Sequence, residues 1–356
     1  MVKTATHPPP LKANTSFLII LMGSLGDVVR GLCIVSHIKN NLPNSRITWL
    51  VEPKWSELIN IHPQIDRIII FNRPRNLLGV WQLYRDLARE NFDITLDLQR
   101  HFKSGVFSLL SVAKRRIGFH RQNAKEFNWL FNNEHIEWVR NELEFPKWRH
   151  YLKFTAYLGF PEPEAEALEF GISSHDPRIR IPNSIAQIGG PYIAVVMGSS
   201  WETKDWLFDK YYRLVKNMLF SDNRTVVLVG DQSKIDEAAN LCDKISSGKL
   251  INLVGKTSLL EVAAVLAAAA AGVGPDSGPA HLSAAVGTPY VTLFGPTPPI
   301  RTAPYRCDHL VVQSELDCAP CYKKECPDLD RKCMRLVSVE MVEKKISEAL
   351  AMGAIK

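Results

Sequence analysis

Small polar residues that could bind an anion follow an apolar run at 192–197. Ser199 and Ser200 come directly after Gly198, and Lys204 follows four residues later. Hydroxyl and backbone N–H groups donate hydrogen bonds to phosphate oxygens, and an ammonium group neutralises their charge. The pattern suits a diphosphate site. A surface loop with its tryptophans packed beneath would show the same residues, and the two interpretations are about even.

A second candidate anion site contains Asp276, Ser277, Gly278, Pro279 and His281. Proline is favoured in the first turn of a helix, and the N–H groups exposed there can bind an anion. The histidine falls in the same turn and would approach the same anion. The alternatives are simple helix capping by Asp276 or Ser277 and a half-buried histidine without a ligand.

Two further aspartates follow apolar runs. Asp27 comes after residues 17–22 and a short loop containing Gly23 and Gly26, and Asp231 comes after residues 227–230. Asp27 could act as a general base, or it could simply be stabilised by the positive end of the helix dipole. Its position alone favours the second interpretation. Asp231 could accept hydrogen bonds from ribose hydroxyls or cap a helix, and its position favours the cap.

The elements that must position these residues alternate between apolar and helix-like segments. Continuous apolar strands followed by helices are typical of parallel sheets covered on both faces. The sequence therefore predicts an α/β chain with two doubly wound, Rossmann-like domains that face one cleft. The expected strands are 17–22, 46–51, 65–71, 92–98, 116–119, 192–197, 224–229, 250–254, 272–274 and 290–294.

A connector punctuated by proline and glycine separates the two runs of strands. We expect a flexible leader at 1–15, a first domain at 16–180 and a second domain at 181–337. A final helical segment at 338–356 is expected to pack back toward the first domain.

Length and composition exclude several classes of protein. The chain has 356 residues, of which 46% are hydrophobic and 22% charged, as in soluble proteins of about two domains rather than in disordered chains. The longest apolar run, 262–271, is too short to span a membrane and is read as a buried helix. Residues 1–15 carry no apolar signal region, so we expect a cytoplasmic protein.

The positive charge is concentrated in one window. Residues 100–125 contain seven Lys or Arg and no Asp or Glu, whereas the whole chain carries a net charge of +6. The rest of the chain therefore sums to about −1. A basic stripe in an otherwise neutral protein indicates an anionic partner.

Four of the seven cysteines lie close together, at Cys318, Cys321, Cys326 and Cys333. Four thiols within a short segment could bind zinc, but the spacing lacks the paired motif of a zinc ribbon and two prolines interrupt it. We expect free thiols in a reducing compartment and no metal.

Together these segments resemble glycosyltransferase family 9, the ADP-heptose:lipopolysaccharide heptosyltransferases. The resemblance spans nearly the whole chain after the leader. Its most specific pieces are Asp276-Ser277-Gly278-Pro279-Ala280-His281-Leu282 and Phe294-Gly295-Pro296-Thr297. The other matching segments are 26–29, 97–104, 198–206 and the cysteine-containing tail.

The resemblance implies a GT-B fold and an inverting transfer of heptose without a metal or another cofactor. Asp27 would take the proton from the acceptor hydroxyl, and Lys204 would stabilise the departing ADP. The second domain would bind most of the ADP-sugar donor. Its donor-binding residues would be Ser199, Ser200, Asp231, Asp276, Ser277, Gly278, Pro279 and His281.

The first domain would bind a lipid-linked inner-core acceptor that carries Kdo or heptose. We expect Gly26, Arg100, Lys103 and Arg121 to contact this acceptor. Basic residues at 114–116 would lie nearer an anionic membrane surface, in peripheral contact with it. Two alternatives stay open: a GT-B nucleotide-sugar epimerase and a non-enzymatic anion-binding protein. The aromatic residues are too sparse to indicate a nucleic-acid partner.

Overall fold

The protein is described by a computed structural model that covers residues 10–72, 77–164, 167–327 and 330–353. Residues 1–9 of the predicted leader and 354–356 of the predicted last segment lie outside the described residues. The chain divides into two compact units, Met1–Gly171 and Ile172–Lys356. This division comes before the boundary expected at 180–181.

The first unit is built on one sheet of parallel strands. Its strands follow the order β3-β2-β1-β4-β5-β6, which is the strand order of a Rossmann fold. Strand β1 lies between β2 and β4, so the chain reverses its direction of winding between β1 and β4. The strands are β1 (Ser16–Ile20), β2 (Arg46–Val51), β3 (Arg67–Ile70), β4 (Ile94–Asp97), β5 (Arg115–Gly118) and β6 (Glu134–His135).

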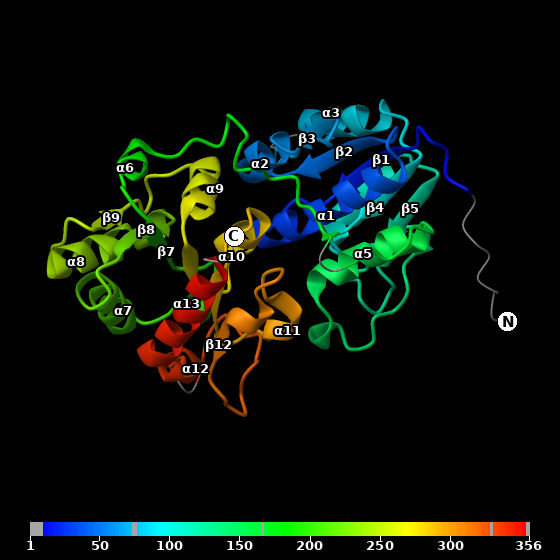
Figure 1. The fold of residues 1–356 in the computed structure, drawn as a ribbon. Coiled ribbons are helices and arrows are strands. Elements are labelled where there is room, and N and C mark those ends of the chain that lie inside the picture. The colour runs from blue at the N-terminus through cyan, green and yellow to red at the C-terminus, as the bar shows by residue number, and fades with distance from the viewer. Residues whose placement is uncertain (1–9, 73–76, 165–166, 328–329, 354–356) are drawn as a thin grey trace. The chain divides into compact units, whose positions relative to one another are not determined.

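Helices connect these strands and cover the sheet. Helices α1 and α5 pack against each other (Figure 1). Helix α4 packs on β4 and on a short 3-10 helix, η2 (Asn128–Leu130). The sequence does not predict α4 as a helix or β6 as a strand. The helices are α1 (Leu25–Asn41), α2 (Ser56–Asn60), α3 (Leu77–Ala88), α4 (Phe102–Leu110) and α5 (Lys147–Tyr157).

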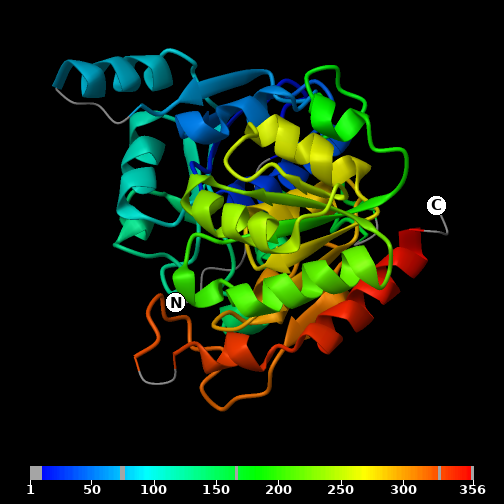
Figure 2. The same ribbon diagram turned by 90° about the vertical axis from the view of Figure 1, so that its left-hand side faces the viewer.

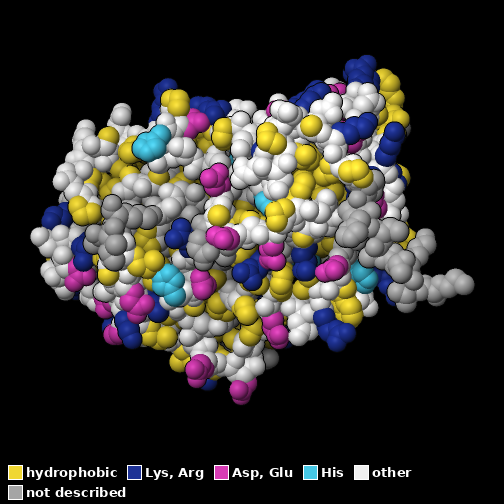
Figure 3. All heavy atoms as spheres, turned by 45° about the vertical axis from the view of Figure 1, so that its right-hand side comes forward, with side chains coloured by type: hydrophobic (Ala, Val, Ile, Leu, Met, Phe, Trp, Pro, Cys, Tyr) yellow, Lys and Arg dark blue, Asp and Glu magenta, His cyan; other side chains and the backbone are white. Residues whose placement is uncertain are grey.

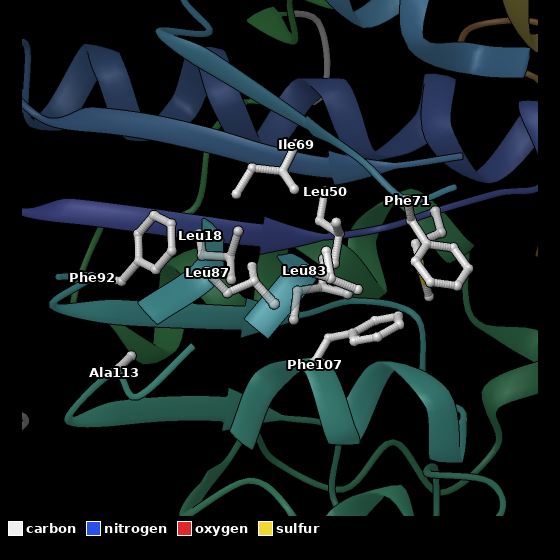
Figure 4. Packing of buried hydrophobic residues seen from close by; sticks show 11 residues of the cluster. Leu18, Leu50, Ile69, Phe71, Leu83, Leu87, Phe92, Phe107 and Ala113 are labelled. Atoms are coloured by element: carbon white, nitrogen blue, oxygen red, sulfur yellow. The ribbon is translucent and has the colours of Figure 1, made fainter. Parts of the chain in front are cut away.

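One hydrophobic cluster of the first unit fills the space between the sheet and helices α3 and α4. Leu18, Leu50 and Ile69 point from three neighbouring strands toward Leu87 and Phe107 of the helices (Figure 4). All five side chains are buried. The continuous apolar strands read from the sequence are therefore packed as expected for a sheet covered by helices.

The second unit repeats the same strand order. Its sheet runs β12-β11-β10-β7-β8-β9, with all neighbours parallel, so β7 and β10 here correspond to β1 and β4 in the first unit. The sequence does not predict β12. The strands are β7 (Tyr192–Met197), β8 (Thr225–Gly230), β9 (Leu250–Asn252), β10 (Ala271–Pro275), β11 (Tyr290–Phe294) and β12 (Val311–Gln313).

The last helix belongs to the second unit. Helix α13 contacts β10, β11, β12 and α7, and Figure 2 shows it alongside α7. The described part of segment 338–356 therefore covers this unit's own sheet. That the segment also packs back toward the first domain stays a prediction. The helices are α6 (Asn183–Ala186), α7 (Phe208–Phe220), α8 (Ile235–Ile245), α9 (Leu259–Ala268), α10 (Gly278–Ala285), α11 (Pro299–Thr302), α12 (Lys332–Leu336) and α13 (Val339–Gly353).

Helix α9 begins at a complete capping box. The Ser258 hydroxyl accepts from the Glu261 N–H at 3.2 Å, and the Glu261 carboxylate accepts from the Ser258 N–H at 2.7 Å. The apolar run 262–271, read as a buried helix, is helical and mostly buried up to Ala268, but the helix ends there and Ala271 begins β10. Across the described residues, no helix combines the length and the apolar character that crossing a membrane requires.

The packing of Phe107 predicts a stability effect. Its ring lies 4.9 Å from the Phe71 ring and is buried in the cluster. Phe107→Ala should lower the free energy of unfolding by about 3–5 kcal/mol, because it leaves a cavity. Phe220→Ala removes a ring that is 61% exposed and serves as the control. Equal urea denaturation curves for the two variants would contradict the prediction.

Candidate functional site

Both sheets place polar loops at their switch points. In a doubly wound sheet, ligands bind beyond the carboxyl ends of the two strands between which the winding reverses. These strands are β1 and β4 in the first unit and β7 and β10 in the second. Asp27 follows β1, Arg100 and Lys103 follow β4, Lys204 follows β7 and Asp276 follows β10. The sequence therefore locates the candidate residues at the correct edge of each sheet.

Asp27 lies in the first turn of α1 and binds two cations. Its Oδ1 accepts from the Arg30 guanidinium at 2.7 Å and from the Lys147 ammonium at 2.5 Å. The other oxygen, Oδ2, lies 3.4 Å from the Ser24 hydroxyl. Both cations therefore hold the same oxygen, and Oδ2 is engaged only by this longer contact among the described residues.

These cations determine the charge of Asp27. Burial works to raise the pKa of Asp27, but the charges of Lys147 and Arg30 outweigh it and hold the pKa well below its ordinary value of 3.8. Burial lowers the pKa of Lys147 to about 8, although its attraction to Asp27 opposes that change. The carboxylate is therefore ionised throughout the physiological range of pH.

A glutamine connects the two loops at this switch point. The Gln99 side-chain oxygen accepts from the backbone N–H of Met22 at 2.8 Å and of Gly23 at 3.3 Å. Asp97, at the end of β4, is fully buried and accepts from the Asn128 amide at 2.6 Å. Burial raises the pKa of Asp97, so this residue supports the loop rather than acting as a second exposed carboxylate.

A pocket of about 360 Å³ opens beside this loop within the first unit. Its polar lining has both signs of charge, from Glu52, Lys54, Lys103 and Glu126, and it includes the Trp55 ring. The Lys103 ammonium lies 3.6 Å from the Glu52 carboxylate and 4.5 Å from the centre of the Phe71 ring. Gly26, also predicted to bind the acceptor, is buried in α1.

Three of the seven cations in the basic window are paired with acids from elsewhere in the chain. Arg100 donates to Glu142 at 2.6 Å, and Arg115 donates to Glu134 at 2.8 Å. Arg121 is exposed and does not line the pocket. On the face drawn in Figure 3, Lys and Arg side chains are interspersed with Asp and Glu side chains. The sequence suggested a continuous basic stripe, but the window does not form one.

The second unit holds its principal charge pair across its own switch point. The Lys204 ammonium donates to the Asp276 carboxylate at 2.8 Å and contacts the Asp276 carbonyl oxygen at 3.3 Å. The same carboxylate accepts from the hydroxyls of Thr297 at 2.8 Å and Thr302 at 3.2 Å. Burial works to raise the pKa of Asp276, but Lys204 and His281 hold it below its ordinary value.

The helix start at 277–281 differs from simple capping. Ser277 is the N-cap of α10, but its side chain makes no capping hydrogen bond, and the Asp276 carboxylate is bound to Lys204 instead. Ser277 therefore holds the cap position through its backbone alone, and Asp276 does not cap the helix. His281 is buried rather than half-buried, with Nε2 at 4.0 Å from Asp276, while Gly278 and Pro279 form the first turn as predicted.

The loop after β7 is shaped by glycine and by a second charge pair. Gly198 has φ +81°, and a side chain there would collide with Lys234, which pairs with the buried Asp205 at 2.9 Å. The Ser199 hydroxyl lies 2.8 Å from the Asp205 carboxylate and 2.7 Å from the Trp201 carbonyl oxygen, so its one proton is donated within this loop. Of the two predicted serines, only Ser200 has an exposed position.

Asp231 caps a helix turn, as its position favoured. Its carboxylate accepts from the Ser233 N–H at 2.9 Å and from the Ser233 hydroxyl at 2.5 Å, and the residue is exposed at the end of β8. The carboxylate therefore lies at the same sheet edge as Lys204, which leaves the predicted ribose contact open.

The four clustered cysteines line one small pocket of about 30 Å³ in the second unit, and all four are free thiols. Across the described ranges, no group of three or more His, Cys, Asp or Glu residues has an arrangement that could hold a metal ion. Burial and the neighbouring thiols raise the pKa of Cys333.

With this geometry described, the chain can be compared with known proteins. Residues 80–330 match glycosyltransferase family 9 (heptosyltransferase). The chain belongs to glycosyltransferase family 9. It is 29% identical over 299 residues to the lipopolysaccharide core heptosyltransferase OpsX of Haemophilus influenzae, covering 83% of each chain. It is 27% identical to lipopolysaccharide heptosyltransferase 1 of Pseudomonas aeruginosa, covering 87% of this chain and 86% of the relative.

Solved structures of the family share its fold. The family 9 enzyme of Veillonella parvula superimposes with a TM-score of 0.80 at 18% identity, covering 96% of this chain and 99% of that one. Escherichia coli heptosyltransferase WaaC with ADP gives a TM-score of 0.76 at 21% identity, covering 94% and 100%. The predicted α/β fold with two Rossmann-like GT-B domains is confirmed for this family 9 chain.

Sequence reasoning missed several residues that complete the two half-sites. Arg30 follows Asp27 by three residues, and this helical spacing could have indicated the pair. Lys147 contacts Asp27 from a different helix, and no local pattern indicates such a contact. Thr297 lies in the family-like segment 294–297, but the sequence indicates no role for it, and it gives no sign that Thr302 reaches Asp276.

The cations around Asp27 predict a change in its titration. Lys147→Met removes a positive charge, so the pKa of Asp27 should rise by about 1–3 pH units. The carboxylate would then become protonated at a higher pH as the solution is acidified. Carboxyl NMR of aspartate-labelled protein would measure this change. Lys153→Met, on the same helix but paired with Glu137, is the control, and an equal titration of Asp27 in both variants would contradict the assignment.

Proposed function

We propose that this chain transfers heptose from ADP-heptose to the inner core of lipopolysaccharide, with inversion at the anomeric carbon. The observation that carries the proposal is Asp27, a partly buried carboxylate that stays ionised at the switch point of the first sheet. Membership of family 9 and the names of its relatives indicate the sugar and the acceptor class.

Asp27 is the proposed base. The acceptor hydroxyl oxygen attacks the anomeric carbon of the heptose while the bond from that carbon to the ADP oxygen breaks. The hydroxyl proton passes to Asp27, and Oδ2 is the suitable oxygen because Arg30 and Lys147 both occupy Oδ1. A base with a low pKa accepts this proton only as the acceptor oxygen becomes acidic in the transition state, when its bond to carbon forms.

Lys204 is the proposed electrophilic group for the departing ADP. An ammonium has three N–H donors, and Asp276 accepts two of them through its carboxylate and its carbonyl oxygen. The third is available to a diphosphate oxygen. This cation supplies the charge stabilisation that a divalent metal supplies in other transferases, so we propose transfer without a metal. Ser200, Ser277, Gly278, Pro279, His281 and Asp231 remain the proposed donor contacts.

The acceptor half-site is proposed around the pocket beside Gln99. Lys103 lines this pocket, whereas Arg100 and Arg121 do not. Of the three cations predicted to contact the acceptor, Lys103 is therefore the one that we assign to this half-site. We place the enzyme at the cytoplasmic side of a membrane in peripheral contact with its surface, because its proposed acceptor is lipid-linked.

The decisive experiment assays transfer from ADP-heptose to inner-core acceptor. Asp27→Asn should lower kcat by about 10²–10⁴-fold, because it removes the general base, while the Kd for ADP stays at the wild-type value. Preserved ADP binding also shows that the second unit is folded. Wild-type rates should be equal with and without a chelator.

Asp236→Asn is the matched control, since Asp236 is an exposed acidic residue in the first turn of α8. It should transfer at the wild-type rate. Near-normal turnover by Asp27→Asn would remove Asp27 from the role of base. Conversion of ADP-heptose to another sugar without acceptor would instead favour an epimerase.

The pocket makes a separate kinetic prediction. Lys103→Gln should raise the KM for the acceptor by about tenfold and leave the KM for ADP-heptose unchanged, since a hydrogen bond to a charged group is lost on one substrate only. Arg46→Gln, at the start of β2 and so at the opposite end of the sheet, is the control. A rise in the KM for ADP-heptose alone would contradict the assignment of Lys103 to the acceptor site.

A further inference from the structure

Helix α4 exposes an apolar stripe on the outside of the first unit. Phe102, Val106 and Leu109 lie at positions i, i+4 and i+7, which fall on one face of a helix. Phe102 is 49% exposed and Leu109 is 48% exposed. The opposite face carries Phe107 into the core, so the exposed stripe is not needed to pack α4.

The stripe continues onto the segments next to α4. The Phe102 ring meets the Phe131 ring edge-on at 5.1 Å, and Phe131 follows Leu130, the last residue of η2. Leu130 is 60% exposed, Phe127 is 70% exposed and Val112, just beyond α4, is 61% exposed. We call these residues the α4–η2 surface: Phe102, Val106, Leu109, Val112, Phe127 and Leu130.

Cations border the α4–η2 surface. Lys114 and Lys125 are exposed, lie two residues from Val112 and Phe127 respectively, and make no ion pair with any described residue. The neighbouring acid, Glu126, accepts from the His101 ring and from a backbone N–H, both at 3.1 Å.

The other nearby charges are internally satisfied. Arg115 is paired with Glu134, and the Arg116 guanidinium donates to the carbonyl oxygens of Phe131 and Ala113. The border of the α4–η2 surface is therefore net cationic.

We infer that the α4–η2 surface docks onto an anionic phospholipid bilayer, an inference that rests on the proposed lipid-linked acceptor. Apolar side chains enter the boundary between headgroups and acyl chains, while lysines at the rim attract lipid phosphates. A second copy of the chain fits less well, because a symmetric contact would bring the cationic borders of both copies into one interface. Lysine is also depleted at protein interfaces.

The test measures sedimentation of the full chain with vesicles. The wild type should bind phosphatidylcholine vesicles containing about 30% phosphatidylglycerol much more strongly than pure phosphatidylcholine vesicles, and binding should weaken as salt is raised. Phe127→Ser with Leu130→Ser should lower partitioning at least about tenfold, because two apolar side chains no longer enter the bilayer. Lys114→Gln with Lys125→Gln should lower it about tenfold or more.

Phe220→Ser is the matched control, since it removes an equally exposed ring from α7 in the second unit and should bind vesicles like the wild type. Equal binding to both vesicle types, or unchanged binding after Phe127→Ser with Leu130→Ser, would overturn the inference. So would a wild-type dimer in sedimentation velocity that this double variant converts to a monomer.

Activity separates this inference from the proposed function. The Phe127→Ser, Leu130→Ser variant should transfer heptose to a deacylated, water-soluble acceptor at the wild-type rate. It should show a raised KM only for acceptor embedded in anionic vesicles. If the wild type itself transfers no heptose, the proposed function fails, and the vesicle binding is judged by sedimentation alone.

Discussion

A carboxylate that stays ionised just beyond a parallel strand of this fold keeps a cation beside it. Removing a charged oxygen from water is costly, and burial alone would drive such a group to take up a proton. Asp27 avoids this through Lys147 and Arg30, and Asp276 avoids it through Lys204. The placement of α5, which brings Lys147, and of the loop after β7, which brings Lys204, follows from that requirement. The same pairing keeps each group charged at the switch point of its own sheet.

The two units meet this constraint in parallel ways. Each has the same strand order, and in each a side chain bridges the two loops at the switch point: Gln99 to Met22 in the first, Lys204 to Asp276 in the second. The bridge in the first unit is neutral and only positions the backbone. The bridge in the second is charged, so the group that fixes the loop is also the one suited to a diphosphate. In the first half-site, Gln99 positions the loops and a different residue, Asp27, carries the charge. In the second, Lys204 does both.

Sequence reasoning recovered what depends on local pattern. Continuous apolar runs indicated both sheets, and the residues after them marked the edges where Asp27 and Asp276 lie. It did not recover contacts made by the tertiary fold. The basic window contains no acid, yet Arg100 pairs with Glu142 and Arg115 with Glu134, both beyond the window, so a local charge count overstated the exposed charge. Helix α4 was missed because its central glycine and serines weaken a helical pattern that packing against η2 restores.

Neither sheet borrows a strand from the other within the described residues, since every ladder closes inside its own unit. The backbone hydrogen bonds of each half are therefore complete without the other half. Each half then behaves as a cooperative unit with its own opening free energy. Inherited or engineered damage is confined accordingly: a cavity in the first unit weakens that unit's own sheet and leaves the strand ladders of the second unit intact. The two halves can for this reason accumulate substitutions at different rates.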